Sequence, residues 1–171
     1  MNTDNLIPMT IRLETVVSEA LANKARLSGQ EVADYAADVL TDHVLPDVRE
    51  IDPSVGKRLT AEIEVKAKAI AMARRFTKQG FDPNVTLKVF QKIKADDELR
   101  NLYVRAIGGP GDERGNPVKA RINRSLGAAI KTAIGATPAK TTNGHPVKVQ
   151  VSNEFIFSYT LLEPPSVKSA I

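Results

Sequence analysis

The chain has 171 residues, enough for one medium-sized domain or two small ones. With 42% apolar residues, 26% charged residues and no cysteine, its composition is that of a soluble globular protein and excludes disulfides, thiolate chemistry and cysteine-ligated zinc. No apolar run approaches the roughly 20 residues that span a bilayer. The opening segment MNTDNLIPMT also lacks the basic and apolar regions of a secretory signal. The sequence therefore predicts a cytoplasmic protein without a membrane partner.

The net charge of +4 is divided unevenly along the chain. Residues 1–52 hold four basic and ten acidic side chains, a net charge of −6. The remaining residues hold twenty basic and ten acidic side chains, a net charge of +10. Such asymmetry suggests that the two parts have different partners, and the basic part is suited to a polyanion.

The N-terminal segment carries strand and helix patterns in close succession. Residues 9–14 alternate apolar and polar side chains, which predicts a strand. Apolar residues then recur at helical spacing on both sides of Gly29, which predicts helices over residues 15–28 and 31–44. The stripe of the second helix consists of Val32, Tyr35, Ala36, Val39, Leu40 and Val44. Two prolines and several acids then predict a linker over residues 46–56 that cannot be one continuous helix.

The basic part predicts four helices followed by a β-hairpin. The helices are expected at 57–78, 85–94, from Asp96 or Asp97 to Ile107, and 117–134, where Asn116 is the N-cap and Pro117 the first helical residue. The first of them is expected to bury Leu59, Ile63, Ala67 and Ile70. Alternation over residues 147–159 predicts the hairpin.

These elements divide the chain into a module (1–45), the linker (46–56), a basic helical domain (57–163) and a flexible tail (164–171). The predicted fold class is mainly α with short β. The order of helix, helix, helix and hairpin in the basic domain resembles a winged-helix arrangement, on element order alone.

The N-terminal module cannot close a core alone, because a lone strand leaves both edges unpaired and about fifty residues bury little apolar surface. Two copies would solve this by pairing their strands over four helices, so we expect a homodimer. The succession of Met9–Leu13, a helix, Gly29 and Val32–Leu40 resembles the ribbon-helix-helix transcription factors of the Arc/MetJ/CopG kind.

The resemblance implies an intermolecular two-stranded ribbon that enters the major groove of double-stranded DNA. The outward strand positions, Thr10 and Arg12, would contact bases, and arginine can bind guanine in a bidentate manner. The inward positions Met9, Ile11 and Leu13 would form the core. The backbone N–H groups of Gln30, Glu31 and Val32 would hold a phosphate at the start of the second helix.

In the basic domain, the helix at 117–134 has the composition of a recognition helix. Its first turns should present side chains of the types that contact phosphates and base edges, and the hairpin should add one lysine. The candidate DNA-binding residues here are Lys119, Arg121, Asn123, Arg124, Lys131 and Lys148.

An enzyme is not expected. The only histidines, His43 and His145, lack metal-ligand spacing, and the glycine-rich stretch 108–111 lacks the Lys-Ser/Thr of a phosphate loop. We expect no cofactor and no metal. The leading hypothesis is a dimeric, sequence-specific DNA-binding protein that acts as a transcriptional repressor. The alternatives are an accessory DNA-binding protein of plasmid transfer or partition, and an antitoxin-like protein-interaction module.

Overall fold

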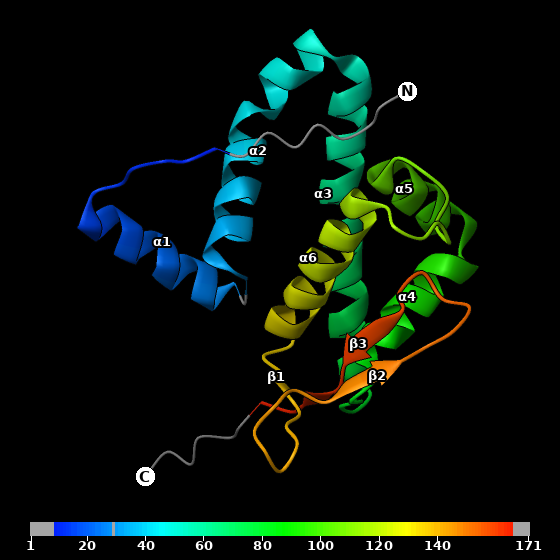
Figure 1. Cartoon of the computed structure of the whole chain (residues 1–171). Coiled ribbons are helices and arrows are strands. Elements are labelled where there is room, and N and C mark those ends of the chain that lie inside the picture. Colours follow the sequence, from blue (N-terminus) through cyan, green and yellow to red (C-terminus); the bar gives the residue numbers. More distant parts are fainter. Residues whose placement is uncertain (1–8, 29, 166–171) are drawn as a thin grey trace.

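The computed structural model describes residues 9–28 and 30–165, and this part of the chain is mainly helical with a small β portion (Figure 1). The predicted fold class is confirmed at this level. The helices are α1 (Thr15–Leu27), α2 (Val32–Ile51), α3 (Pro53–Thr77), α4 (Val85–Ala95), α5 (Asp97–Ile107) and α6 (Pro117–Ala133). The strands are β1 (Thr137–Pro138), β2 (Lys148–Gln150), β3 (Ser158–Thr160) and β4 (Leu162–Glu163).

The predicted N-terminal strand is absent from the single chain. Residues 9–14 belong to no strand, and α1 begins directly after them at Thr15. Glu14 has extended backbone angles, but a strand is defined by a hydrogen-bonded neighbour and this segment has none. The structure thus does not support the ribbon. Helix α1 lies close to the predicted range 15–28, and α2 begins close to the start of the predicted range 31–44. Gly29 and the last six residues of the predicted tail, 166–171, lie outside the described residues.

The predicted linker over residues 46–56 is helical on both sides of a single break at Asp52. Helix α2 continues through Pro46 to Ile51, and α3 begins at Pro53. The helix tolerates the proline because the buried Leu45 and partly buried Val48 hold this turn in place. Only Asp52 separates the two helices. As the N-cap of α3, its carboxylate accepts hydrogen bonds from the backbone N–H groups of Ser54 and Val55.

Helix α3 lies at the centre of the molecule and packs against α2, α4, α5 and α6. Its buried face is not the predicted one: Ile63 is 40% exposed, and the residues that are buried are Gly56, Ala61, Val65, Ala69 and Ala73. Small side chains every four residues form a shallow ridge, and this ridge lets several helices approach α3 closely.

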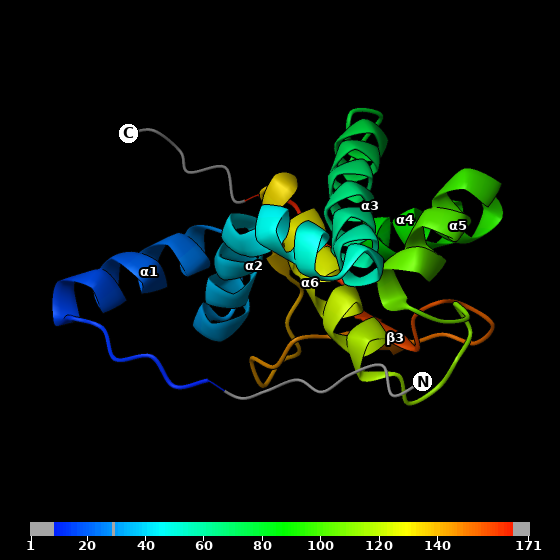
Figure 2. The same ribbon diagram turned by 90° about the horizontal axis from the view of Figure 1, so that it is seen from above.

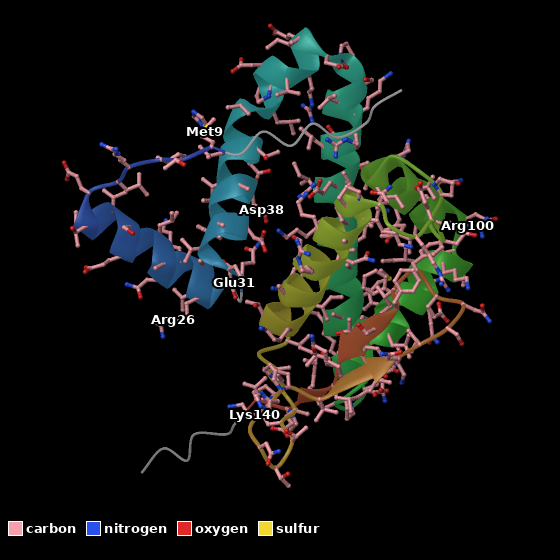
Figure 3. The ribbon with its side chains drawn as sticks, in the orientation of Figure 1. Met9, Arg26, Glu31, Asp38, Arg100 and Lys140 are labelled. Carbon is pink, nitrogen blue, oxygen red and sulfur yellow. The ribbon has the colours of Figure 1, made fainter. Side chains whose placement is uncertain are left out.

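Besides the packing of α2 on α3, polar contacts link the N-terminal helices to this body. The carboxylate of Asp38 on α2 forms an ion pair with the ammonium of Lys66 on α3, with 2.5 Å between Oδ2 and Nζ. Asp38 lies on the side of α2 that faces α6 (Figure 3). The hydroxyl of Thr132 on α6 donates to the carbonyl of Ser28 at the end of α1, at 2.8 Å. In both ribbon views α1 lies at the edge of the molecule, on the opposite side from α4 and α5 (Figure 2).

The C-terminal segment folds back onto the helices as two antiparallel strand pairs. The predicted hairpin is confirmed as the β2–β3 pair, in which Val149 lies opposite Tyr159. The sequence analysis did not predict the second pair, β1–β4. Among the described residues, no helix combines the length and the apolar character needed to cross a membrane.

Candidate nucleic-acid interface

The N-terminal module exposes an unusual amount of apolar surface. Of the thirteen large apolar side chains that are exposed in the described residues, ten lie between Met9 and Val44. They are Met9, Ile11, Leu13, Val16, Val17, Leu27, Val32, Val39, Leu40 and Val44. Such a concentration of exposed apolar side chains in one part of a chain favours an interaction site. Met9 and Arg26 lie on the part of the molecule remote from α4 and α5 (Figure 3).

The predicted base-contacting residues lie within this exposed segment. Thr10 and Arg12 are both exposed, between the apolar residues Met9, Ile11 and Leu13. In the single chain the whole of this segment is exposed, including an arginine and a hydroxyl.

The backbone N–H groups that were predicted to hold a phosphate at the start of α2 are partly used in hydrogen bonds within the chain. The backbone N–H of Gln30 donates to the carbonyl of Ala25 at 3.0 Å, and its side-chain amide donates to Asp38 at 2.7 Å. Glu31 occupies the N-cap position with no side-chain cap hydrogen bond. A phosphate here would have to use the N–H groups that follow Gln30.

Three of the six candidates in the basic domain are engaged inside the protein. Lys119 is only 3% exposed; its ammonium donates to the carbonyl of Glu113 at 2.9 Å and lies 5.0 Å from the centre of the Phe157 ring. Burial lowers the pKa of Lys119, against the attraction of the nearby acids Asp112 and Glu113. Lys119 therefore stabilises the loop before α6.

Arg121 and Asn123 bind neighbouring elements of the fold. The guanidinium of Arg121 donates two hydrogen bonds of 2.6 Å to the carboxylate of Glu62 on α3, and the pKa of Arg121 is raised chiefly by this bond. The amide oxygen of Asn123 accepts the Tyr103 hydroxyl at 2.7 Å, and its NH2 donates to the carbonyl of Phe155 at 3.1 Å. The polar groups of Arg121 and Asn123 are thus used within the protein.

The structure brings the other three candidates together. Arg124 and Lys131 on α6 and Lys148 on β2 line one groove of about 370 Å³, and Asn123 lines it as well. Sequence reasoning did not find the apolar and hydroxyl residues that complete it, because they come from α4 and from the C-terminal strands. The apolar residues are Phe90, Ile156, Tyr159 and Leu162, and the hydroxyl residues are Thr86, Ser158 and Thr160.

A pattern in α6 could have indicated this groove. Arg124, Gly127, Ala128 and Lys131 follow the i, i+3, i+4, i+7 spacing that places side chains on one face of a helix. Two cations flank two small residues on that face, and small residues permit another molecule to approach the helix closely.

Comparisons with protein-family models, with curated proteins and with solved structures found no match to this chain.

Proposed function

We propose that this protein is a dimeric, sequence-specific DNA-binding protein that acts as a transcriptional repressor, with residues 9–13 of two copies paired as a ribbon. The observation that carries the proposal is the exposed apolar set of the N-terminal module. Ten large apolar side chains on a strand-like segment and two helices are what a ribbon-helix-helix chain presents to its partner before the two copies pair.

Pairing would complete the structure that the single chain leaves open. An antiparallel ribbon would satisfy the backbone groups of residues 9–13 and turn Ile11 toward the four helices. Thr10 and Arg12 of both copies would then lie on the opposite face of the ribbon. A two-stranded ribbon fits the major groove, and its two arginines would be related by the twofold axis of a palindromic site.

The charges of the basic domain support a contribution to affinity. Arg124, Lys131 and Lys148 form no ion pair among the described residues and can approach phosphates. The acidic balance of residues 1–52 leaves the ribbon with little electrostatic attraction of its own. The ribbon therefore supplies specificity, and the basic domain supplies part of the affinity.

The first test is the oligomeric state. Ile11→Asp is expected to sediment as a monomer at concentrations where the natural chain is a dimer, because the charge would be buried in the ribbon core. Thr10→Asp is the matched control: it adds the same charge one position away, on the outward face, and should remain dimeric. Sedimentation velocity measures both. A dimeric Ile11→Asp protein would contradict the ribbon.

The second test is DNA discrimination. The preferred duplex is selected from a random pool with the full chain, and binding to it and to a random duplex is titrated with salt. Arg12→Ala should lose about 1–3 kcal/mol on the preferred duplex and little on the random one, because a bidentate arginine–guanine contact exists only at the correct base. Arg26→Ala on α1 is the control, since it removes an exposed arginine outside the ribbon. Equal losses on both duplexes would show that Arg12 does not read sequence.

A further inference from the structure

The groove between α6 and the C-terminal strands has the dimensions of a small-molecule site. Its volume of about 370 Å³ falls within the roughly 300–1,000 Å³ of ligand pockets in proteins. Residues from α4, α6 and the β2–β3 pair line it, so its shape depends on the folded domain rather than on one flexible loop.

The charge of the groove is entirely positive. Arg124, Lys131 and Lys148 line it, and no aspartate or glutamate does. Other cations of the described residues, such as Lys66 and Arg121, are neutralised by carboxylates, whereas these three have no acidic partner there. Three unneutralised cations around one cavity favour a ligand with more than one negative charge.

The wall of the groove on α6 leaves room for that ligand. Gly127 lies between the two cations of the helix, and a Cβ atom added to it would meet no other atom within 4 Å. Arg124 and Lys131 are seven residues apart, roughly 10 Å along the helix axis at about 1.5 Å per residue. This spacing allows both to reach one ligand from its two ends.

The apolar floor distinguishes this groove from a surface that binds only the phosphates of a DNA duplex. Ile156, Tyr159 and Leu162 contribute apolar side chains, and Ser158 and Thr160 contribute hydroxyl groups at its edge. Duplex phosphates are held by cations and need no apolar floor. A ring-bearing molecule, in contrast, would lie on the small apolar area that these side chains leave accessible, since Ile156, Tyr159 and Leu162 are 4%, 8% and 3% exposed.

We propose that this groove binds a small organic phosphate of the size of a nucleoside monophosphate. The phosphate, which carries about −1.5 to −2 charges at pH 7, is held by Arg124, Lys131 and Lys148. The ring system rests on the apolar floor, and the hydroxyl groups of Ser158 and Thr160 bind its polar edge. This site is independent of the ribbon, but it uses the three cations that are also proposed to contribute to DNA affinity.

The binding test uses the full-length chain and isothermal titration calorimetry with AMP, GMP, CMP and UMP. We expect saturable binding of at least one of them at one site per chain. The corresponding nucleoside and inorganic phosphate should each bind at least about tenfold more weakly than the nucleotide, because each lacks half of the contacts. Failure of all four nucleotides to bind at millimolar concentration overturns the proposal.

Two variants locate the site. Gly127→Phe fills the groove from a position with open space and should abolish nucleotide binding, and Arg124→Gln should weaken it about tenfold. Arg75→Gln, an exposed arginine on α3, is the matched control and should bind as the natural chain does. Circular dichroism verifies that each variant is folded. Unchanged nucleotide affinity in Arg124→Gln, or in a folded Gly127→Phe, overturns the proposal.

A separate arm distinguishes this site from the DNA interface. Arg12→Ala should leave nucleotide binding unchanged, because it lies outside the groove. If Gly127→Phe abolished duplex binding while the natural chain bound no nucleotide, the three cations would be assigned to DNA and the small-ligand site would be wrong.

Discussion

Replacing Tyr103 with alanine is expected to lower the free energy of unfolding by about 3–5 kcal/mol, the usual range for removing a large aromatic side chain from a core. Tyr103 is 0% exposed. Its ring stacks on Phe155 with centroids 5.0 Å apart and meets Phe90 edge-on at 6.3 Å. Alanine would leave a cavity between α4, α5 and the C-terminal segment. Urea denaturation followed by circular dichroism measures the change.

Tyr103→Phe separates the ring from the hydroxyl. Burial raises the pKa of Tyr103, so the hydroxyl stays protonated and donates to Asn123 over the whole working pH range. Phenylalanine keeps the ring contacts but leaves the Asn123 oxygen without this donor, at a cost of about 1–3 kcal/mol. If the phenylalanine variant lost as much stability as the alanine variant, the hydrogen bond rather than the ring would hold this part of the core.

Replacing Gly111 with alanine is expected to destabilise the fold by about 1–3 kcal/mol through overpacking. A Cβ atom at Gly111 would lie 2.5 Å from the Phe155 ring. That ring cannot turn aside, because it is buried and stacked on Tyr103. The loop between α5 and α6 or the C-terminal segment would have to move. Thermal unfolding of the variant should show a lower Tm.

Gly127→Ala is the control for Gly111→Ala, with the opposite sign. Gly127 lies inside α6, and an added methyl group meets open space. Alanine is about 0.8–1.0 kcal/mol more favourable than glycine within a helix, so this variant should raise the Tm. If both glycine variants moved the Tm in the same direction, the contact between Gly111 and Phe155 would not be the cause.

Local patterns determined most of the secondary structure. The stripe Leu99, Leu102, Tyr103 and Ile107 is buried as its spacing predicts, and Asn116 caps α6 through a 3.0 Å bond from the backbone N–H of Lys119. The β2–β3 hairpin follows from alternation. These features depend on neighbours a few residues apart, and the sequence contains that information directly.

The sequence misled us where packing overrides local preference. Pro46 predicted a helix break, yet α2 continues to Ile51 and packs against α3. On α3 the larger apolar residues predicted the buried face, but the central position among several helices favours the smaller stripe of Ala61, Val65, Ala69 and Ala73. Propensity is a weak prior when the neighbours of a helix come from distant parts of the chain.

The candidate site divides in the same way. The sequence alone placed Thr10 and Arg12 on an alternating segment and cations on α6, since residue type and spacing are local properties. Only the tertiary structure decided which cations are free: Glu62 lies 59 residues from Arg121 and neutralises it, while Arg124 and Lys131 face a groove whose floor comes from the C-terminal strands. A side chain's role depends on its partners, and long-range folding alone brings those partners together.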